Sequence, residues 1–439
     1  MSTKRRVVIT GLGSVSCLGM DVDSMWSSLL EGKCGIDRIK AFNHDKFPCK
    51  LAGEVAEFKI NQHVPKSYRK AVKLMSRDIE LAILAANEAI ADAGLITKAT
   101  DEANINIDPE RTAINIGAGL ISCDLEEIAP AVAMSATDGK FDLKKWGNVG
   151  LNNLTPIWLL KYLPNMLACH IGIIHDVRGP SNTITCGEAG GYLAIGETAQ
   201  VIMRGDADIA IGGGCEAKVN PIVMLRQMLL KRTTTSEEAQ TACRPFDVNA
   251  AGSVFGEGAG IVVLEELEHA KKRGAKIYAE LVGFGESNSL STKYEQLEHD
   301  GKGVQIAIEK ALDEAMISGG ELDLIIPNGL GIPVDDLAES TAIANVLQDA
   351  VDGVPVWPTK SQISATGAAS GGIDLITAVK AMNDGKIGAA KNCDNKAPGC
   401  KLNINNELLE TEISHALCCG YTFGGQTAAL VVKRISNSE

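Results

Sequence analysis

Short apolar runs alternate with longer amphipathic stretches along the whole chain. Apolar runs bounded by glycine predict buried strands, and apolar residues spaced by three and four predict helices. In the first half, strands are predicted over 6–11, 113–119, 207–214 and 260–264, and helices over 75–94 and 189–204. In the second half, strands are predicted over 277–285, 322–327, 415–420 and 428–433, and helices over 302–315 and 368–385.

The second half repeats the plan of the first. Residues 277–285 have the same form as residues 7–13, an apolar strand that ends in a G-x-G turn. Strands that alternate with helices in two similar halves predict an α/β protein. We expect an N-terminal half over 1–265, with an insertion around 122–164, and a C-terminal half over 266–439.

Charge and hydropathy narrow the class of protein. The 439 residues carry a net charge of −13, which argues against a nucleic-acid partner. No apolar run is long enough to span a bilayer, and the N-terminal MSTKRRVVITGLG enters a strand directly, without the apolar region of a signal peptide. These features predict a protein of the cytoplasm that neither binds nucleic acid nor enters a membrane.

Two features could suggest a cofactor, and neither has the required spacing. The 12 cysteines include no C-x-x-C pair, so most of them are expected to be small buried side chains rather than metal ligands or disulfide partners. The G-x-G at 11–13 lacks the third glycine of a dinucleotide-binding loop, because Ser16 stands there. We therefore expect no metal and no cofactor.

Several long stretches resemble the β-ketoacyl-ACP synthases, and synthase II in particular. They are VVITGLGSVSCLG near the start, the GPS turn at 179–181, RGDADIAIGGGCEA, the run 244–285 and the closing FGGQTAALVV. The resemblance covers almost the whole chain and implies the thiolase fold, an α/β fold of five layers, αβαβα, made of two similar halves. It also implies an acyltransferase of fatty acid or polyketide biosynthesis, whose substrates are carried by an acyl carrier protein.

The catalytic positions of the family are altered in this chain. The family uses a cysteine, two histidines and a lysine; laid over this chain, the cysteine position holds Glu188, and Cys186 lies two residues earlier. The histidine positions hold Asn328 and Ala365, whereas Lys360 is kept. A carboxylate is a poor acyl acceptor, and each lost hydrogen-bond donor costs about a hundredfold or more in rate. We expect Glu188 to sit at a helix N-terminus near Lys360 or Asn328 without performing condensation.

Two further sets of residues match the family. Phe423, Gly424 and Gly425 match its gating loop, although a glycine hairpin with a packed phenylalanine explains them equally well. Lys66, Arg69 and Lys70, followed by Lys73, match its carrier-protein docking patch, although a solvated helix face would look the same. The resemblance also implies a dimer interface near the strand at 207–212 or its neighbour, and the insertion at 122–164 either helps to build that interface or merely covers the surface.

Three functions remain open. The pattern resembles the chain-length factors, which keep the fold, lose the catalytic residues and pair with an active ketosynthase whose acyl tunnel they shape. A second possibility is an active acyl-ACP enzyme, a 3-oxoacyl-ACP synthase or a malonyl-ACP decarboxylase, that uses Glu188 or Cys186. A third is a homodimer that binds an acyl chain without reacting.

Overall fold

A large mixed sheet runs through the molecule. The computed structural model describes residues 5–290 and 297–435. Across the sheet, the strands follow the order β14 (Asn403–Ile404), β12 (Pro355–Val356), β11 (Leu324–Ile326), β16 (His415–Tyr421), β17 (Gln426–Lys433), β10 (Ala279–Asn288), β1 (Val7–Val15), β9 (Glu257–Glu266), β8 (Ile209–Ala217), β4 (Thr112–Ala118) and β7 (Ser181–Thr185). Small ribbons pair β2 (Ile36–Arg38) with β3 (Leu51–Gly53), β5 (Ala136–Thr137) with β6 (Lys140–Phe141), and β13 (Lys386–Ile387) with β15 (Leu409–Glu410).

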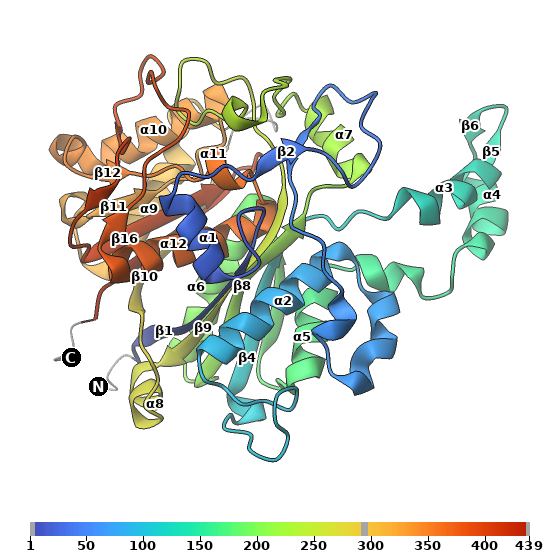
Figure 1. Cartoon of the computed structure of the whole chain (residues 1–439), viewed down its shortest axis with the longest axis horizontal. Helices are drawn as coiled ribbons and strands as arrows, with labels where there is room; N and C mark the ends of the chain where they lie inside the picture. Colours follow the sequence, from blue (N-terminus) through green and yellow to red (C-terminus); the bar gives the residue numbers. More distant parts are fainter. Residues whose placement is uncertain (1–4, 291–296, 436–439) are drawn as a thin grey trace.

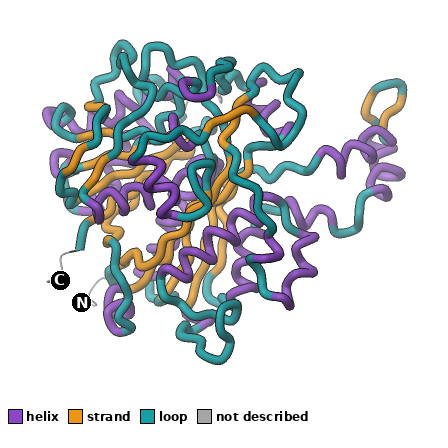
Figure 2. The backbone as a smooth tube through the Cα atoms, in the orientation of Figure 1, coloured by secondary structure: helices purple, strands orange, loops and turns teal. Residues whose placement is uncertain are grey.

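The helices pack on both faces of this sheet and between its two halves (Figure 2). They are α1 (Val22–Leu30), α2 (Arg77–Asp92), α3 (Leu125–Met134), α4 (Leu143–Lys145), α5 (Met166–His175), α6 (Gly190–Met203), α7 (Pro221–Leu229), α8 (Leu267–Lys272), α9 (Lys302–Ala315), α10 (Pro333–Leu347), α11 (Lys360–Ile363) and α12 (Ser370–Asp384). No helix in the described part of the chain is long and apolar enough to cross a membrane.

The sheet is splayed at its centre, which produces five layers. β1 and β10 pair only at Val8–Glu280 and Ile9–Ala279. Helices α6 and α12 lie against each other between the halves and contact strands of both. Helices α2 and α5 cover the outer face of the N-terminal half, and α9 and α10 cover that of the C-terminal half (Figure 1). This is the predicted αβαβα order, and its main hydrophobic clusters lie between successive layers. Our division at 265/266 falls within the last two residues of β9 and stays a proposal.

The paired glycines lie inside strands, and the predicted G-x-G turns are wrong. β1 continues through Gly11 and Gly13 to Val15, and β10 continues through Gly283 and Gly285 to Asn288. A Cβ atom on any of these four glycines would stand 2.0–2.2 Å from a backbone oxygen of α2 or α9. Each glycine pair therefore lets a helix approach its strand closely. Both strands also have a shift in register just before the glycine pair, which is the same feature at equivalent places in the two halves.

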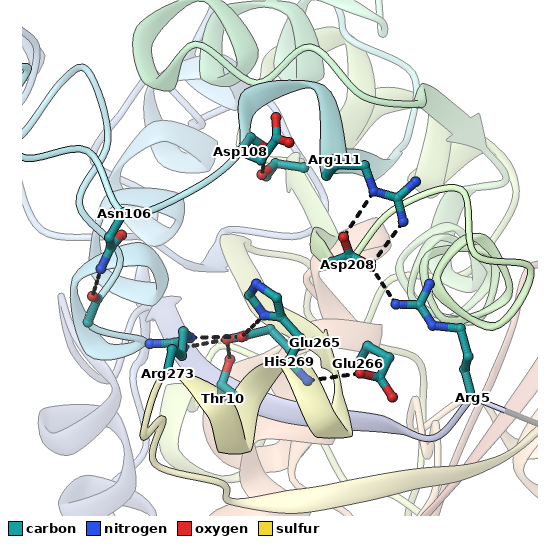
Figure 3. Close-up of polar contacts among 12 residues, drawn as sticks. Arg5, Thr10, Asn106, Asp108, Arg111, Asp208, Glu265, Glu266, His269 and Arg273 are labelled. Carbon is teal, nitrogen blue, oxygen red and sulfur yellow. Dashed lines mark hydrogen bonds and ion pairs between the residues drawn. The ribbon is translucent and has the colours of Figure 1, made fainter.

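Arginines hold two carboxylates where the N-terminal strand meets its neighbours (Figure 3). Asp208 lies between Arg5 and Arg111, whose hydrogen bonds and charges hold the pKa of its carboxyl down to about 2. The buried Glu265 of β9 accepts hydrogen bonds from Arg273 and Thr10. These contacts tie β1, β9 and α8 together at the junction of the halves.

The insertion forms an arm that reaches away from the body of the molecule (Figure 1). It carries α3, the β5–β6 ribbon and α4. Its apolar side chains are unusually exposed, with Phe141 at 53% and Leu143 at 74%. An arm that does not cover the surface and exposes apolar side chains has the character of an interaction element.

Candidate active site

A tight turn between β7 and α6 presents Glu188. Cys186 follows the strand, and a 3₁₀ turn over Gly187–Ala189 leads into the helix. Gly187 has φ +49°, a left-handed conformation that glycine adopts at little cost. Glu188 lies in the first turn of the combined helix and is 1% exposed. The sequence correctly placed this carboxylate at a helix N-terminus.

The cation that pairs with Glu188 is Lys218, at the end of β8. The Lys218 Nζ lies 3.4 Å from Oε1 of Glu188 and 2.9 Å from Oε1 of Glu216. Glu216 is the second-last residue of β8, and Lys218 follows the strand directly. Residues two apart in an extended chain point the same way, so both side chains reach the same side. All three side chains are at most 5% exposed, so they form a buried carboxylate–ammonium–carboxylate cluster.

The second central helix also begins at this cluster. A 3₁₀ turn over Gly367–Ala369 precedes α12, and the backbone N–H of Ala368 donates to Glu216 at 2.9 Å. A Cβ atom on Gly367, which has φ +61°, would stand 1.9 Å from the Glu216 carboxylate. The positive ends of α6 and α12 therefore converge on the cluster, where negative charge is stabilised.

Burial and nearby cations set the charge state of Glu188. Burial raises the pKa of Glu188, but the charges of Lys218 and Arg232 outweigh burial and hold it below the ordinary value. Arg232 is itself buried and pairs with Asp335 at 2.9 Å. For Lys218, burial lowers the pKa, and the two carboxylates more than reverse that effect. The site therefore contains an ionised carboxylate and a protonated amine at neutral pH.

A cavity of about 460 Å³ opens beside this cluster. Its lining includes Cys186, Glu188, Phe423 and Gly424. Gly425 is absent from the described lining; it turns the loop with φ +95°. The structure thus brings together most of the residues that we assigned to the nucleophile position and the gate.

The ring of Phe423, which borders this cavity, is flanked by two arginines. The guanidinium carbons of Arg226 and Arg232 lie 5.5 and 5.4 Å from the ring centre. Such cation–π contacts each contribute about 0.5–2 kcal/mol. They hold the loop in the position seen here, with the ring over the cavity lining.

The other two altered positions do not border the cavity. Neither Asn328 nor Ala365 is among its described lining residues. The Asn328 side-chain amide donates to the carbonyl of Tyr421 at 3.2 Å, so its donor is already engaged. Ala365 is fully buried and pairs through its backbone with Val254 and Gly256.

Lys360 belongs to a separate buried ion pair, with Asp374, whereas the lysine that pairs with Glu188 is Lys218. The Lys360 Nζ lies 2.6 and 2.7 Å from the two carboxylate oxygens of Asp374. The Tyr192 hydroxyl also donates to that carboxylate. This pair links α11, α12 and α6, and its role in the structure is to tie the two central helices together.

Cys186 lacks the features of an activated nucleophile. Burial, with a smaller contribution from Glu286, raises the pKa of its thiol, which keeps the thiol protonated at neutral pH. The histidines nearest to it in the sequence lie in α5. His170 bonds to the Tyr68 hydroxyl at 2.8 Å and His175 to the Thr97 hydroxyl at 2.8 Å. Both histidines are buried and serve packing.

The four basic residues near position 70 are exposed on a 3₁₀ helix over Lys66–Leu74. Among the described residues, none of Lys66, Arg69, Lys70 and Lys73 forms an ion pair. Unpaired exposed charges of one sign on an acidic protein remain available to an acidic partner.

Ser364 carries backbone strain beside Ala365. It is fully buried with φ +74° and ψ 172°, a region that non-glycine residues rarely occupy. We expect Ser364→Gly to raise the free energy of unfolding by about 1 kcal/mol, because relief of strain exceeds the entropic cost of glycine. Urea denaturation measures this change. The matched variant Ser361→Gly, at a helical position of α11, should lower stability, and an equal loss in both variants would contradict the assignment of strain.

Sequence reasoning missed Lys218, Glu216 and the Arg232–Asp335 pair. One signal was present: Glu216 and Lys218 follow an apolar strand at a spacing of two, which places two charges on one side of a strand end. Arg232 and Asp335 are 103 residues apart, so only the fold brings them together.

Comparisons with known proteins agree with this architecture. The N-terminal domain model of the β-ketoacyl synthases matches residues 4–270, and the C-terminal domain model matches residues 278–394. The 3-oxoacyl-[acyl-carrier-protein] synthase 2 of Staphylococcus aureus is 33% identical over 435 residues, which cover 99% of each chain.

Two solved structures share the fold over 99% of this chain and 100% of theirs at 26% identity. The ishigamide ketosynthase/chain length factor has a TM-score of 0.84. A type II PKS acyl-carrier protein in complex with its ketosynthase bound to the hexaketide has a TM-score of 0.85. The domain models and the identity over the full length show that the chain belongs to the β-ketoacyl synthase family.

Proposed function

We propose that this chain is a non-condensing ketosynthase-like subunit of fatty acid or polyketide biosynthesis that acts in the cytoplasm. It pairs with an active β-ketoacyl-ACP synthase and shapes that partner's acyl tunnel, as a chain-length factor does. The observation that carries the proposal is the buried Glu188–Lys218–Glu216 cluster at the nucleophile position. An ionised, paired carboxylate does not accept an acyl group readily. It also fills the position that the carbonyl group of a substrate would need.

Two surfaces support pairing with a second subunit. β7 is one of the two edge strands of the large sheet, and Ser181, Asn182 and Thr185 on it are exposed. β8, which contains the strand that we expected near 207–212, lies between β9 and β4 and is already paired on both sides, so within the N-terminal half β7 is the strand with an unpaired edge. The exposed apolar side chains of the arm form a second surface that a partner would cover.

Co-purification tests this pairing. We expect the tagged chain to recover a co-expressed ketosynthase, encoded by a neighbouring gene, as a stable 1:1 complex. The amount of this complex should exceed the amount of the chain's own homodimer. The double variant Phe141→Glu/Leu143→Glu should weaken recovery at least about tenfold, because charges would replace covered apolar side chains. The control Leu408→Glu alters a leucine elsewhere whose exposure of 52% is close to the 53% of Phe141, and it should have no effect. A homodimer that ignores the ketosynthase would favour the acyl-binding alternative.

The exposed basic residues support docking of an acyl carrier protein, which is acidic. The triple variant Lys66→Glu/Arg69→Glu/Lys70→Glu should weaken carrier-protein binding at least about tenfold at low salt, and less at high salt, because the attraction is screened. The control Lys272→Glu reverses one exposed charge on α8. Binding by fluorescence anisotropy checks this, and equal losses for the triple variant and the control would contradict a specific patch.

A further inference from the structure

We propose that Lys218 and the converging N-termini of α6 and α12 form a carboxylate-binding site, and that Glu188 fills it as an internal ligand. Lys218 is the positioning residue of this site. This inference rests on the proposed function and deepens it. It names the contacts that hold Glu188 at the nucleophile position. An external ligand of the same class would be a small carboxylate that replaces the side chain of Glu188.

The two carboxylates that contact Lys218 are held differently. Glu216 accepts a hydrogen bond from Ala368 in addition to its ion pair, so it is fixed to the start of α12. The Oε1 atom of Glu188 has no hydrogen-bond partner among the described residues and lies 3.4 Å from the ammonium. Glu216 is therefore a fixed part of the binding site, and Glu188 is the carboxylate that occupies the site.

The site favours an anion even with Glu216 in place. Glu188 lies at the N-terminus of α6 beside the Lys218 ammonium, and the charge of Arg232 also favours its ionised form. The start of α12 binds Glu216 through the Ala368 N–H. A helix N-terminus stabilises a negative charge through its free N–H groups and its dipole. A buried ammonium adds a charge-assisted contact, which is roughly twice as strong as a neutral one.

An external carboxylate could reach the site through the cavity. Glu188, Glu216 and Lys218 all border its volume of about 460 Å³, which is far larger than acetate. In the wild type, the carboxylate of Glu188 occupies the position beside the Lys218 ammonium. In Glu188→Ala, the same position is open to a ligand from solution.

Chemical rescue of the purified full chain tests the inference. Acetate and formate should raise the melting temperature of Glu188→Ala by about 1–3 °C more than that of the wild type, because a ligand that binds only the folded state stabilises it. Acetamide, which is neutral and of similar shape, should not. The double variant Glu188→Ala/Lys218→Met should lose the response to acetate. A response equal in wild type and variant, or equal for acetate and acetamide, would overturn the proposal.

A second variant keeps the inference testable if Glu188→Ala does not fold. In Glu188→Cys, the introduced thiol should have a pKa at least about one unit below the ordinary 8.5, because Lys218 and the helix N-terminus stabilise the thiolate. The pH dependence of iodoacetamide labelling, located by fragmentation of the labelled peptide because Cys186 lies in the same peptide, measures that pKa. It should rise when Lys218→Met is added. A thiol pKa at or above 8.5 would contradict the site. Both experiments use the chain alone, so their failure is distinct from failure to pair with a ketosynthase.

Discussion

Replacing Lys218 with methionine is expected to lower the free energy of unfolding by about 3–5 kcal/mol. The substitution leaves the carboxylates of Glu188 and Glu216 facing each other in a buried site without their shared cation. Loss of one partner from a buried ion pair is strongly destabilising because the remaining charge keeps its desolvation cost. Urea denaturation at neutral pH measures the loss.

A second substitution should recover part of that stability. Glu188→Gln removes one of the two repelling charges and keeps the shape, so Glu188→Gln/Lys218→Met should be more stable than Lys218→Met alone. The control Lys272→Met, at an exposed position of α8, should change stability by less than about 0.5 kcal/mol. A loss below about 1 kcal/mol in Lys218→Met, or strictly additive effects in the double variant, would contradict the cluster.

Condensation by Glu188→Cys is expected to stay at least about 10⁴-fold below that of an active ketosynthase. A thiol at this position restores a nucleophile, but the two histidine positions still hold Asn328 and Ala365. Each missing donor costs about 10²–10³ in rate, and the Asn328 amide is already bonded to Tyr421. Turnover of malonyl-ACP with an acyl-ACP primer measures the rate, and iodoacetamide labelling confirms that the thiol is accessible.

Adding Asn328→His and Ala365→His is expected to restore little activity. Neither position borders the described cavity, and Ala365 is fully buried, so a larger side chain there overpacks the core at a cost of about 1–3 kcal/mol. If Glu188→Cys/Asn328→His/Ala365→His condensed at a rate near that of an active ketosynthase, these three positions alone would account for the loss of activity. The structure instead shows the buried Glu188–Lys218–Glu216 cluster beside the cavity, and these three substitutions leave Lys218 and Glu216 in place.

Local periodicity predicted the fold well where strands and helices are regular. The helix predicted over 302–315 is observed over Lys302–Ala315, and the strand predicted over 415–420 over His415–Tyr421. The glycine pairs misled the prediction because a close helix contact and a turn both require glycine. Which strand lies at the edge depends on sheet order, so periodicity could not distinguish β7 from β8.

The candidate site was only partly predictable. The family pattern singled out Glu188 and Phe423, and in the structure both border one cavity. The pattern could not show which cation compensates a new carboxylate, since Lys218 and Lys360 are both buried lysines and only the fold separates their partners.

The most direct test of the central claim is the reactivity of the wild-type chain by itself. The purified chain is incubated with acyl-ACP, with malonyl-ACP and with cerulenin; intact mass detects adducts, and product analysis detects β-ketoacyl-ACP. The account predicts an unchanged mass and no condensation above background. A stoichiometric adduct that maps to Cys186, or β-ketoacyl product that disappears in Glu188→Gln, would contradict it.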